Sequence, residues 1–245
     1  MWTQLKIELY KVWKRPLFIA LLLLPIVVFS YECCFPERLA ERTHAFMSFF
    51  NISYSQAFYR YLMTKITFFN LILLVCLCFH YFYIEYKHQG YNSLFTLPQN
   101  KITIYLAKIL LLLLYVIAAG LVIHLLFMFA SVALYDKLSM PELPASLLFI
   151  MGSILIALFQ FLVANFTKNL LFYLITFILL FAVTLVNKIK ILSILLPYSY
   201  VNLSIHEHTL SNVPVEYILP VYILVIAGAG YVVFKHLANG KSKKS

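Results

Sequence analysis

The chain has 245 residues, of which 63% are hydrophobic and only 11% are charged. Soluble domains contain roughly 45–50% apolar and about 25% charged residues, so this composition excludes a water-soluble fold. The formal net charge is +10. Because the basic residues are spread over short segments beside apolar runs, they indicate contact with anionic lipid headgroups and not with nucleic acid.

Residues 2–15 predict an amphipathic helix that lies in the membrane interface. At about 100° per residue, five apolar side chains fall on one arc, whereas the basic side chains lie outside it. The arc consists of Trp2, Leu5, Leu9, Val12 and Trp13. A helix of this kind places its tryptophans at headgroup depth and its lysines toward the cytoplasm. The alternative is an ordinary positive flank of the first span.

Apolar runs along the chain predict an all-α integral membrane protein with six transmembrane helices. Each run is about as long as a bilayer requires. The predicted spans are residues 16–35, 64–84, 104–133, 144–166, 169–187 and 216–236. They form one membrane domain that uses the whole chain.

A further apolar stretch, residues 191–206, is too short to cross the bilayer. Pro197 interrupts it by removing a helix hydrogen bond. We expect this stretch to be re-entrant between the fifth and sixth spans. Because irregular backbone at membrane depth must be buried or line a wet cavity, Pro197 and Tyr198 are candidates for a transport pathway.

The distribution of charge sets the orientation. With the N-terminus inside, the cytoplasmic segments carry 12 basic residues against two acidic ones, Glu8 and Glu85, whereas the outer segments carry seven of each. This pattern follows the positive-inside rule and predicts that both termini are cytoplasmic.

The cytoplasmic connection after the second span contains a short predicted helix over residues 86–98. Ser93 can cap a helical turn, which Pro98 ends. The turn carries three apolar side chains, Leu94, Phe95 and Leu97. Exposed apolar side chains of this kind are suited to docking of a soluble partner, and packing back onto the membrane domain is the alternative.

Two segments of the chain resemble the permease subunits of ABC-2 type transporters. The N-terminal segment reads Leu5-Lys6-Ile7-Glu8-Leu9-Tyr10-Lys11. The loop between the second and third spans reads Leu94-Phe95-Thr96-Leu97-Pro98, followed by Lys101 and Tyr105-Leu106-Ala107-Lys108. That family also has six spans, both ends inside, and short re-entrant helices between the fifth and sixth spans.

The resemblance implies that residues 2–15 are a connecting helix and residues 86–98 a coupling helix on a cytoplasmic ATPase subunit. The ATPase contact would then involve Glu85, Ser93, Leu94, Phe95, Leu97 and Lys101. The family often has an arginine just after the loop proline, whereas this chain has Gln99, Asn100 and Lys101.

The same resemblance implies a multi-pass exporter in the cell (inner) membrane. The chain would pair with a second permease, identical or related, and with two ATPases. The apolar spans fit a hydrophobic or amphipathic substrate such as a peptide, a lipid or a drug-like molecule, and the sequence does not choose among them.

The chain contains no P-loop sequence, so ATP and Mg²⁺ are expected on the partner ATPase and no cofactor on this chain. We therefore expect a transport subunit and not an enzyme. His206-Glu207-His208 places its histidines two apart, whereas the zinc motif on a helix needs them four apart. We expect no metal site.

Several polar residues lie within the predicted spans, where polar groups are costly and often mark a pathway. The candidates are Asn70, His124 and Gln160, with His80 and Asn165. Such residues also form hydrogen bonds between helices, and this structural role is the alternative. Two other classes of protein share the topology: a membrane-embedded enzyme, for which the acidic residues are too few and mostly outside, and an anchor for a multiprotein machine.

Overall fold

The computed structural model describes residues 2–14, 16–87, 100–135, 143–166 and 215–242, together with positions 175 and 178. Within these ranges the regular structure is entirely helical, which confirms the all-α class. The helices are α1 (Trp2–Trp13), α2 (Pro16–Cys33), α3 (Pro36–Phe50), α4 (Tyr54–Lys87), α6 (Lys101–Tyr135), α7 (Leu143–Phe166) and α12 (Val215–Ser242).

Four of the described helices are long and apolar enough to cross a membrane. The apolar segments are Tyr54–Tyr81, Ile102–Ala133, Ser146–Ala164 and Tyr217–His236. They overlap the second, third, fourth and sixth predicted spans, and α2 covers most of the first. The fifth predicted span, apart from positions 175 and 178, and the re-entrant stretch lie outside the described residues. The six-span count and the re-entrant segment therefore stay predictions.

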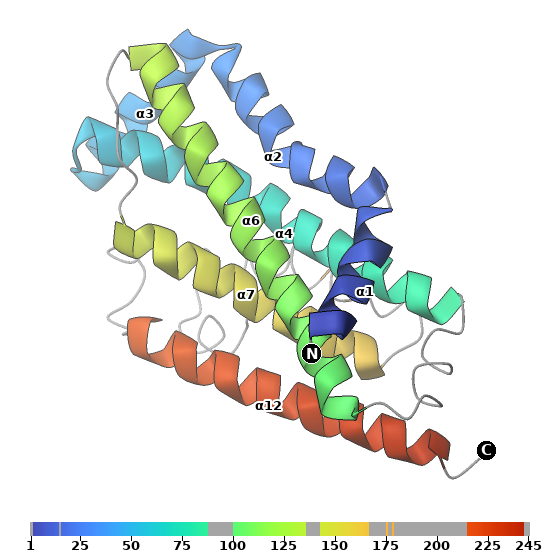
Figure 1. Cartoon of the computed structure of the whole chain (residues 1–245). Coiled ribbons are helices and arrows are strands. Elements are labelled where there is room, and N and C mark those ends of the chain that lie inside the picture. The colour runs from blue at the N-terminus through green and yellow to red at the C-terminus, as the bar shows by residue number, and fades with distance from the viewer. Residues whose placement is uncertain are drawn as a thin grey trace.

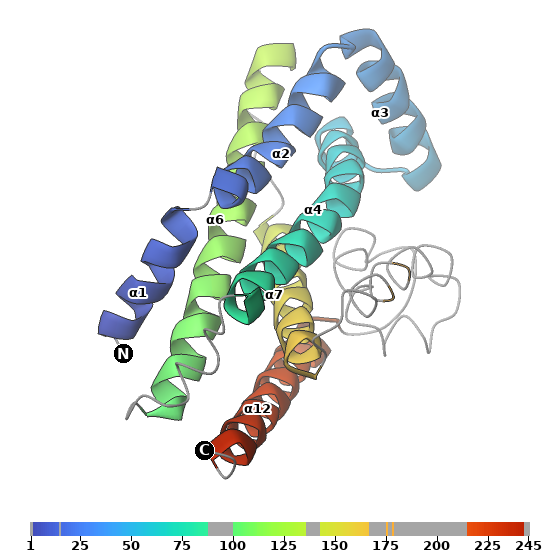
Figure 2. The ribbon, with the colours of Figure 1, turned by 90° about the vertical axis from the view of Figure 1, so that its right-hand side faces the viewer.

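The long helices α2, α4, α6, α7 and α12 form a bundle, and those that follow one another along the chain alternate in direction, with one exception (Figures 1 and 2). Helix α4 runs toward the end of the bundle where α1 and the C-terminal end of α12 lie, and α6 runs away from it. Helices α7 and α12, which pack against each other, run in the same direction. The two chain ends thus lie toward the same end of the bundle.

Helix α3 occupies a segment for which the charge pattern predicts only an outer connection. Local signals explain it: Pro36 stands at the start, Glu37 lies in the first turn, and Asn51 ends the helix in the left-handed conformation with φ of 51°. Proline is pre-organised for a first helical position, an acidic side chain there favours the helix dipole, and asparagine tolerates the left-handed region. Helix α3 lies at the end of the bundle opposite α1 (Figure 2).

Helix α4 begins ten residues earlier than the second predicted span. Ser53 and Gln56 form a reciprocal cap, in which the Gln56 amide donates to the Ser53 hydroxyl and the Ser53 amide donates to the Gln56 side chain. This capping box supplies partners to amides that have none within the helix. The helix therefore starts at Tyr54, before the apolar run that hydropathy detects.

Two of the three core clusters among the described residues occupy the two halves of the bundle. One cluster joins α2, α3, α4, α6 and α7 and includes Leu39, Phe58, Met63, Phe127 and Phe149. The other joins α1, α4, α6, α7 and α12 and includes Leu5, Leu77, Tyr81, Tyr105, Phe161 and Phe234. Because lipid tails are as apolar as these side chains, close packing and hydrogen bonds stabilise such contacts in a membrane.

Candidate functional site

Helix α1 turns a polar face toward the bundle. Glu8 is fully buried, and Gln4 and Leu5 are buried beside it. The helix packs against the N-terminal part of α6 (Figures 1 and 2). A buried carboxylate is tolerated when charged or hydrogen-bonding groups compensate its desolvation. Glu8 has three such partners.

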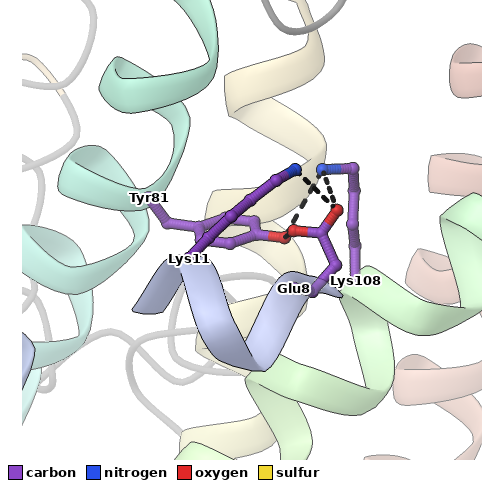
Figure 3. A network of polar contacts seen from close by, with 4 residues as sticks. All are labelled: Glu8, Lys11, Tyr81 and Lys108. Carbon is purple, nitrogen blue, oxygen red and sulfur yellow. Dashed lines mark hydrogen bonds and ion pairs between the residues drawn. The ribbon is translucent and has the colours of Figure 1, made fainter. Parts of the chain in front are cut away.

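The carboxylate of Glu8 connects three helices (Figure 3). Tyr81 on α4 donates a hydrogen bond of 2.6 Å to Oε2 of Glu8. Lys11, on the next turn of α1, donates one of 3.0 Å to Oε1. Nζ of Lys108 on α6 lies 3.6 Å from the same Oε1 and donates to the Tyr81 hydroxyl at 3.4 Å. We call these four residues the Glu8 network.

Burial makes the charges of the Glu8 network interdependent. The side chains of Glu8 and Lys108 are 0% exposed, and that of Lys11 is 33% exposed. Burial alone would raise the pKa of Glu8. The ammonium groups of Lys108 and Lys11 and the hydrogen bonds from Tyr81 and Lys11 lower the pKa by more than burial raises it, so the net pKa lies below its ordinary value. Glu8 is therefore ionised near neutral pH.

Lys108 lies within the apolar segment Ile102–Ala133, where a cation needs a partner. The Glu8 carboxylate supplies the negative charge, and the ring of Tyr81 lies 5.1 Å from the Lys108 ammonium. One carboxylate thus balances two ammonium groups that converge on the same oxygen. Its removal would leave Lys11 and Lys108 facing each other without compensation.

The Glu8 network lies near the C-terminal end of α4 and the N-terminal end of α6. Tyr81 precedes the end of α4 at Lys87, and Lys108 follows the start of α6 at Lys101. At 3.6 residues per turn, each lies within about two turns of its helix end. The Asn100 side chain caps α6 by accepting a hydrogen bond of 3.0 Å from the Ile102 amide. The network therefore joins α1 to both helices that flank residues 88–99.

Tyr105, one turn before Lys108, attaches α6 to α12. Its hydroxyl donates a hydrogen bond of 2.7 Å to the carbonyl of Ala227. A Cβ added at Gly230 would lie only 2.6 Å from this hydroxyl, so the approach requires glycine. The contact extends the connected region from α1, α4 and α6 to the last helix.

The predicted ATPase-contact residues fall mainly outside the described residues. This holds for Ser93, Leu94, Phe95 and Leu97. Glu85 lies in the last turn of α4, and Lys101 is the first residue of α6. The structure places these two backbone positions at the ends of adjacent helices, and the contact itself stays a prediction.

The predicted apolar arc of α1 divides between two surroundings. Leu5 is 3% exposed and Val12 is half-buried, whereas Trp2 is 66%, Leu9 40% and Trp13 78% exposed. The face toward the protein is centred on Glu8 and not on the arc. Lys11, expected to face away with the other lysines, instead points into the network, because the buried carboxylate attracts it.

The predicted pathway residues form separate hydrogen bonds between helices. Asn70 donates to the Ser153 hydroxyl at 3.0 Å. Tyr59 contacts Nε2 of His124 at 3.4 Å and the Ser146 hydroxyl at 2.9 Å. The contacts shown do not join Asn70 to His124, and Pro197 and Tyr198 lie outside the described residues.

A polar stripe runs along α7. Ser146, Ser153 and Gln160 are all buried and are spaced seven residues apart, so they lie on one face of the helix. Ser146 and Ser153 both bond to α4. Small residues with hydroxyl groups allow membrane helices to approach closely and to bond across the contact. A pathway role for Asn70, His124 and Gln160 stays a prediction.

Sequence reasoning missed Glu8, Lys11, Tyr81 and Lys108 as one site. One signal was present, since Lys108 lies inside the predicted span 104–133, where a charged residue calls for a partner. Glu8 is also the only acidic residue in residues 2–15. No group of three or more His, Cys, Asp or Glu side chains that could hold a metal occurs in the ranges described above.

A comparison with protein families matches residues 4–204 to a family described as ABC-2 family transporter protein. The matched range includes most of α1, all of α2, α3, α4, α6 and α7, and the connection between α4 and α6. This match confirms the resemblance found in the sequence. A comparison with curated proteins found no match.

Proposed function

Because the chain belongs to the ABC-2 transporter family, we propose that it is the permease subunit of an ABC exporter and that a separate cytoplasmic ATPase drives it. The observation that carries the proposal is the family match, which includes both helices flanking residues 88–99. ATP and Mg²⁺ bind to the partner chain, and no cofactor binds to this one.

The arrangement of the helices supports docking of the ATPase at residues 86–98. The end of α4, the start of α6, helix α1 and the end of α12 all lie toward one end of the bundle (Figures 1 and 2). By the positive-inside rule, this end faces the cytoplasm, since the basic residues of α1 and of the C-terminal end of α12 lie there. An ATPase bound there would contact the loop with Leu94, Phe95 and Leu97.

The directions of α7 and α12 support six spans. Two parallel membrane helices need an odd number of crossings between them along the chain. The predicted span 169–187 supplies one crossing, and a re-entrant stretch 191–206 adds none. Both termini are then cytoplasmic, as the orientation requires.

Apolar faces directed away from the bundle fit both lipid and a second permease. On α12, Val221, Leu224, Val225 and Val232 are strongly exposed. We propose that the chain pairs with an identical or related permease, as ABC transporters need two membrane halves, and that lipid covers the remaining apolar faces. The absence of charge from most spans favours a hydrophobic or amphipathic substrate.

The rival classes differ in one measurable property. A membrane-embedded enzyme or an anchor has no dedicated ATPase, whereas the proposed permease co-purifies with one from its native membrane. Phe95→Asp would place a charge in the docking contact and reduce the recovered ATPase while the permease stays monodisperse in detergent.

Phe49→Asp is the matched control for this experiment. Phe49 is strongly exposed on α3, at the opposite end of the bundle, so its substitution leaves ATPase recovery unchanged. Equal recovery with Phe95→Asp and with the unaltered chain would refute docking at this loop. Recovery of no ATPase with the unaltered chain would refute the transporter assignment itself.

A further inference from the structure

We propose that Glu8 is a positioning residue for energy coupling: its carboxylate holds α1, α4 and α6 together near the ends of α4 and α6 that flank residues 88–99, so that a displacement of these helix ends moves the three helices as one unit. The inference rests on the proposed function, because it assumes that an ATPase acts on the loop. It gives α1 a role in coupling, although α1 is not part of the proposed docking contact.

The partners of Glu8 lie on both helices that flank residues 88–99. Tyr81 lies on the helix that enters the loop, and Lys108 lies on the helix that leaves it. Helices α4 and α6 share few direct contacts, whereas α1 packs extensively on α6. The side chains of the Glu8 network therefore add a polar connection between the two flanking helices at this end, beside the apolar contacts of Leu77 and Tyr105 (Figure 3).

The contacts of the Glu8 carboxylate are directional. Both carboxylate oxygens of Glu8 are engaged, Oε2 by Tyr81 and Oε1 by the two lysines. Charge-assisted hydrogen bonds are stronger than neutral ones, and low-dielectric surroundings strengthen them further. Apolar contacts permit sliding, whereas a buried ion held in this way fixes both distance and direction.

Helix α1 carries side chains that are suited to the membrane interface. Trp2 and Trp13 are exposed on the side of α1 away from the bundle, and the Lys6 ammonium lies 5.6 Å from the ring centroid of Trp2. Tryptophans and lysines in this arrangement hold a helix at headgroup depth. Helix α1 then links the flanking helices to a fixed level of the membrane.

The test measures whether the three helices move together. Spin labels are placed at Thr3 on α1 and Ile102 on α6, and in a second protein at Lys87 on α4 and Ile102, after replacement of the four native cysteines by alanine. The distances between the labels are measured by pulsed electron paramagnetic resonance in the complex of the chain with its ATPase, without nucleotide and with ATP plus vanadate. We expect both distances to stay the same in the two states.

Glu8→Gln removes the charge that holds the unit together. We expect the distribution of the distance from Thr3 to Ile102 to broaden and to shift when nucleotide binds, and the ATPase to lose the rate change that the permease causes, although it stays bound. The combined variant Glu8→Lys with Lys108→Glu keeps one carboxylate and two ammonium groups in the network. It should restore both readouts, which a general loss of packing would not allow.

Two further variants keep the test decisive. Lys14→Met removes an exposed charge just after α1, outside the Glu8 network, and should change neither readout. If Glu8→Gln does not fold, Tyr81→Phe is used in its place, because it removes only the hydroxyl that donates to Oε2 of Glu8. It should broaden the distribution of the distance from Lys87 to Ile102.

The outcomes separate the two proposals. If the ATPase binds and hydrolyses ATP, and Glu8→Gln keeps the distances and rate of the unaltered complex, the positioning role is refuted and the transporter assignment stands. Failure of the charge exchange to restore the readouts also refutes the positioning role. If the unaltered chain binds no ATPase, the proposed function fails, and this inference fails with it.

Discussion

The ammonium group of Lys108 lies 3.6 Å from the carboxylate of Glu8, and both side chains are completely buried between α1 and α6. Lys11 approaches the same carboxylate oxygen at 3.0 Å. One negative charge therefore compensates two positive charges in an apolar environment. This imbalance determines how the protein should respond to substitution and to acid.

Removal of the two principal ions should have unequal effects. Glu8→Gln leaves the buried ammonium group of Lys108 and the partly exposed one of Lys11 without a counter-ion, and loss of one partner of a buried pair costs about 3–5 kcal/mol. Lys108→Met leaves Glu8 paired with Lys11 and fills a similar volume, so it should cost clearly less than Glu8→Gln. Thermal unfolding in detergent measures both effects.

The double variant Glu8→Gln with Lys108→Met adds a second check on this asymmetry. It should be more stable than Glu8→Gln alone, because the second substitution removes the uncompensated cation. Lys14→Met, outside the network, serves as the control. Equal destabilisation by Glu8→Gln and Lys108→Met would contradict the proposed charge balance.

The Glu8 network should withstand neutral and mildly acidic pH and open only in stronger acid. The pKa of Glu8 in the folded chain is below the ordinary value of 4.5. A lowered folded pKa contributes stability above the unfolded pKa, and that stability is lost as pH falls through the folded value. The contacts to Lys11, Lys108 and Tyr81 should therefore persist at pH 5 and above and weaken below about 4.5.

Intrinsic fluorescence can report this change selectively. The chain has two tryptophans, Trp2 and Trp13, and both lie on α1. We expect their emission in lipid nanodiscs to change below the ordinary pKa of a glutamate and not between pH 5 and 8. Glu8→Gln should abolish the transition. A transition near pH 6 would show that the carboxylate lacks the expected stabilisation by the lysines.

The hydrogen bond between Asn70 and Ser153 should stabilise the contact of α4 with α7. A double-mutant cycle with Asn70→Ala and Ser153→Ala isolates its contribution. Polar contacts between membrane helices contribute about 0.6 kcal/mol on average and up to about 1.7 kcal/mol. We expect a coupling energy in that range from unfolding measurements. Additive effects of the two substitutions would indicate that the 3.0 Å contact contributes nothing and would favour a role in a pathway.

Hydropathy predicts the long helices well because the thickness of the bilayer requires about 20 apolar residues in each. The apolar segment of α7, Ser146–Ala164, falls within the predicted span 144–166. Helix α3 escapes this reasoning because local signals at Pro36 and Asn51 set its ends and Leu39 packs it onto the bundle, and neither depends on apolar length. Amphipathic helices that do not cross the membrane need such capping signals for their detection.

The site was harder to predict than the helices for a different reason. Periodicity describes one helix at a time, and it ranks Glu8 as a polar residue on the rim of α1. The partners that justify its burial, Tyr81 and Lys108, come from α4 and α6. Their approach depends on tertiary packing, which the spacing of residues within α1 does not encode. A lysine inside an apolar span is the feature from which a search for the partner could begin.

Two glycines of α12 should differ sharply in their tolerance of a methyl group. A Cβ added at Gly228 meets no atom within 4 Å, whereas one at Gly230 would lie 2.6 Å from the hydroxyl of Tyr105. Gly228→Ala should be neutral or stabilising by up to about 1 kcal/mol, since alanine has the higher helix propensity. Gly230→Ala must displace Tyr105 and break its hydrogen bond to Ala227, which leaves the buried Tyr105 hydroxyl without this acceptor and costs about 1–3 kcal/mol.

A compensating variant identifies the cause of that loss. Tyr105→Phe removes the hydroxyl that a Cβ at Gly230 would meet, so Gly230→Ala should cost less in this background than in the unaltered chain. Thermal unfolding of the four proteins gives the coupling between the two positions, and the Gly228→Ala protein controls for general effects of alanine in α12. If Gly230→Ala costs the same with and without the Tyr105 hydroxyl, the steric contact is not the cause, and α6 and α12 are not held together by this close approach.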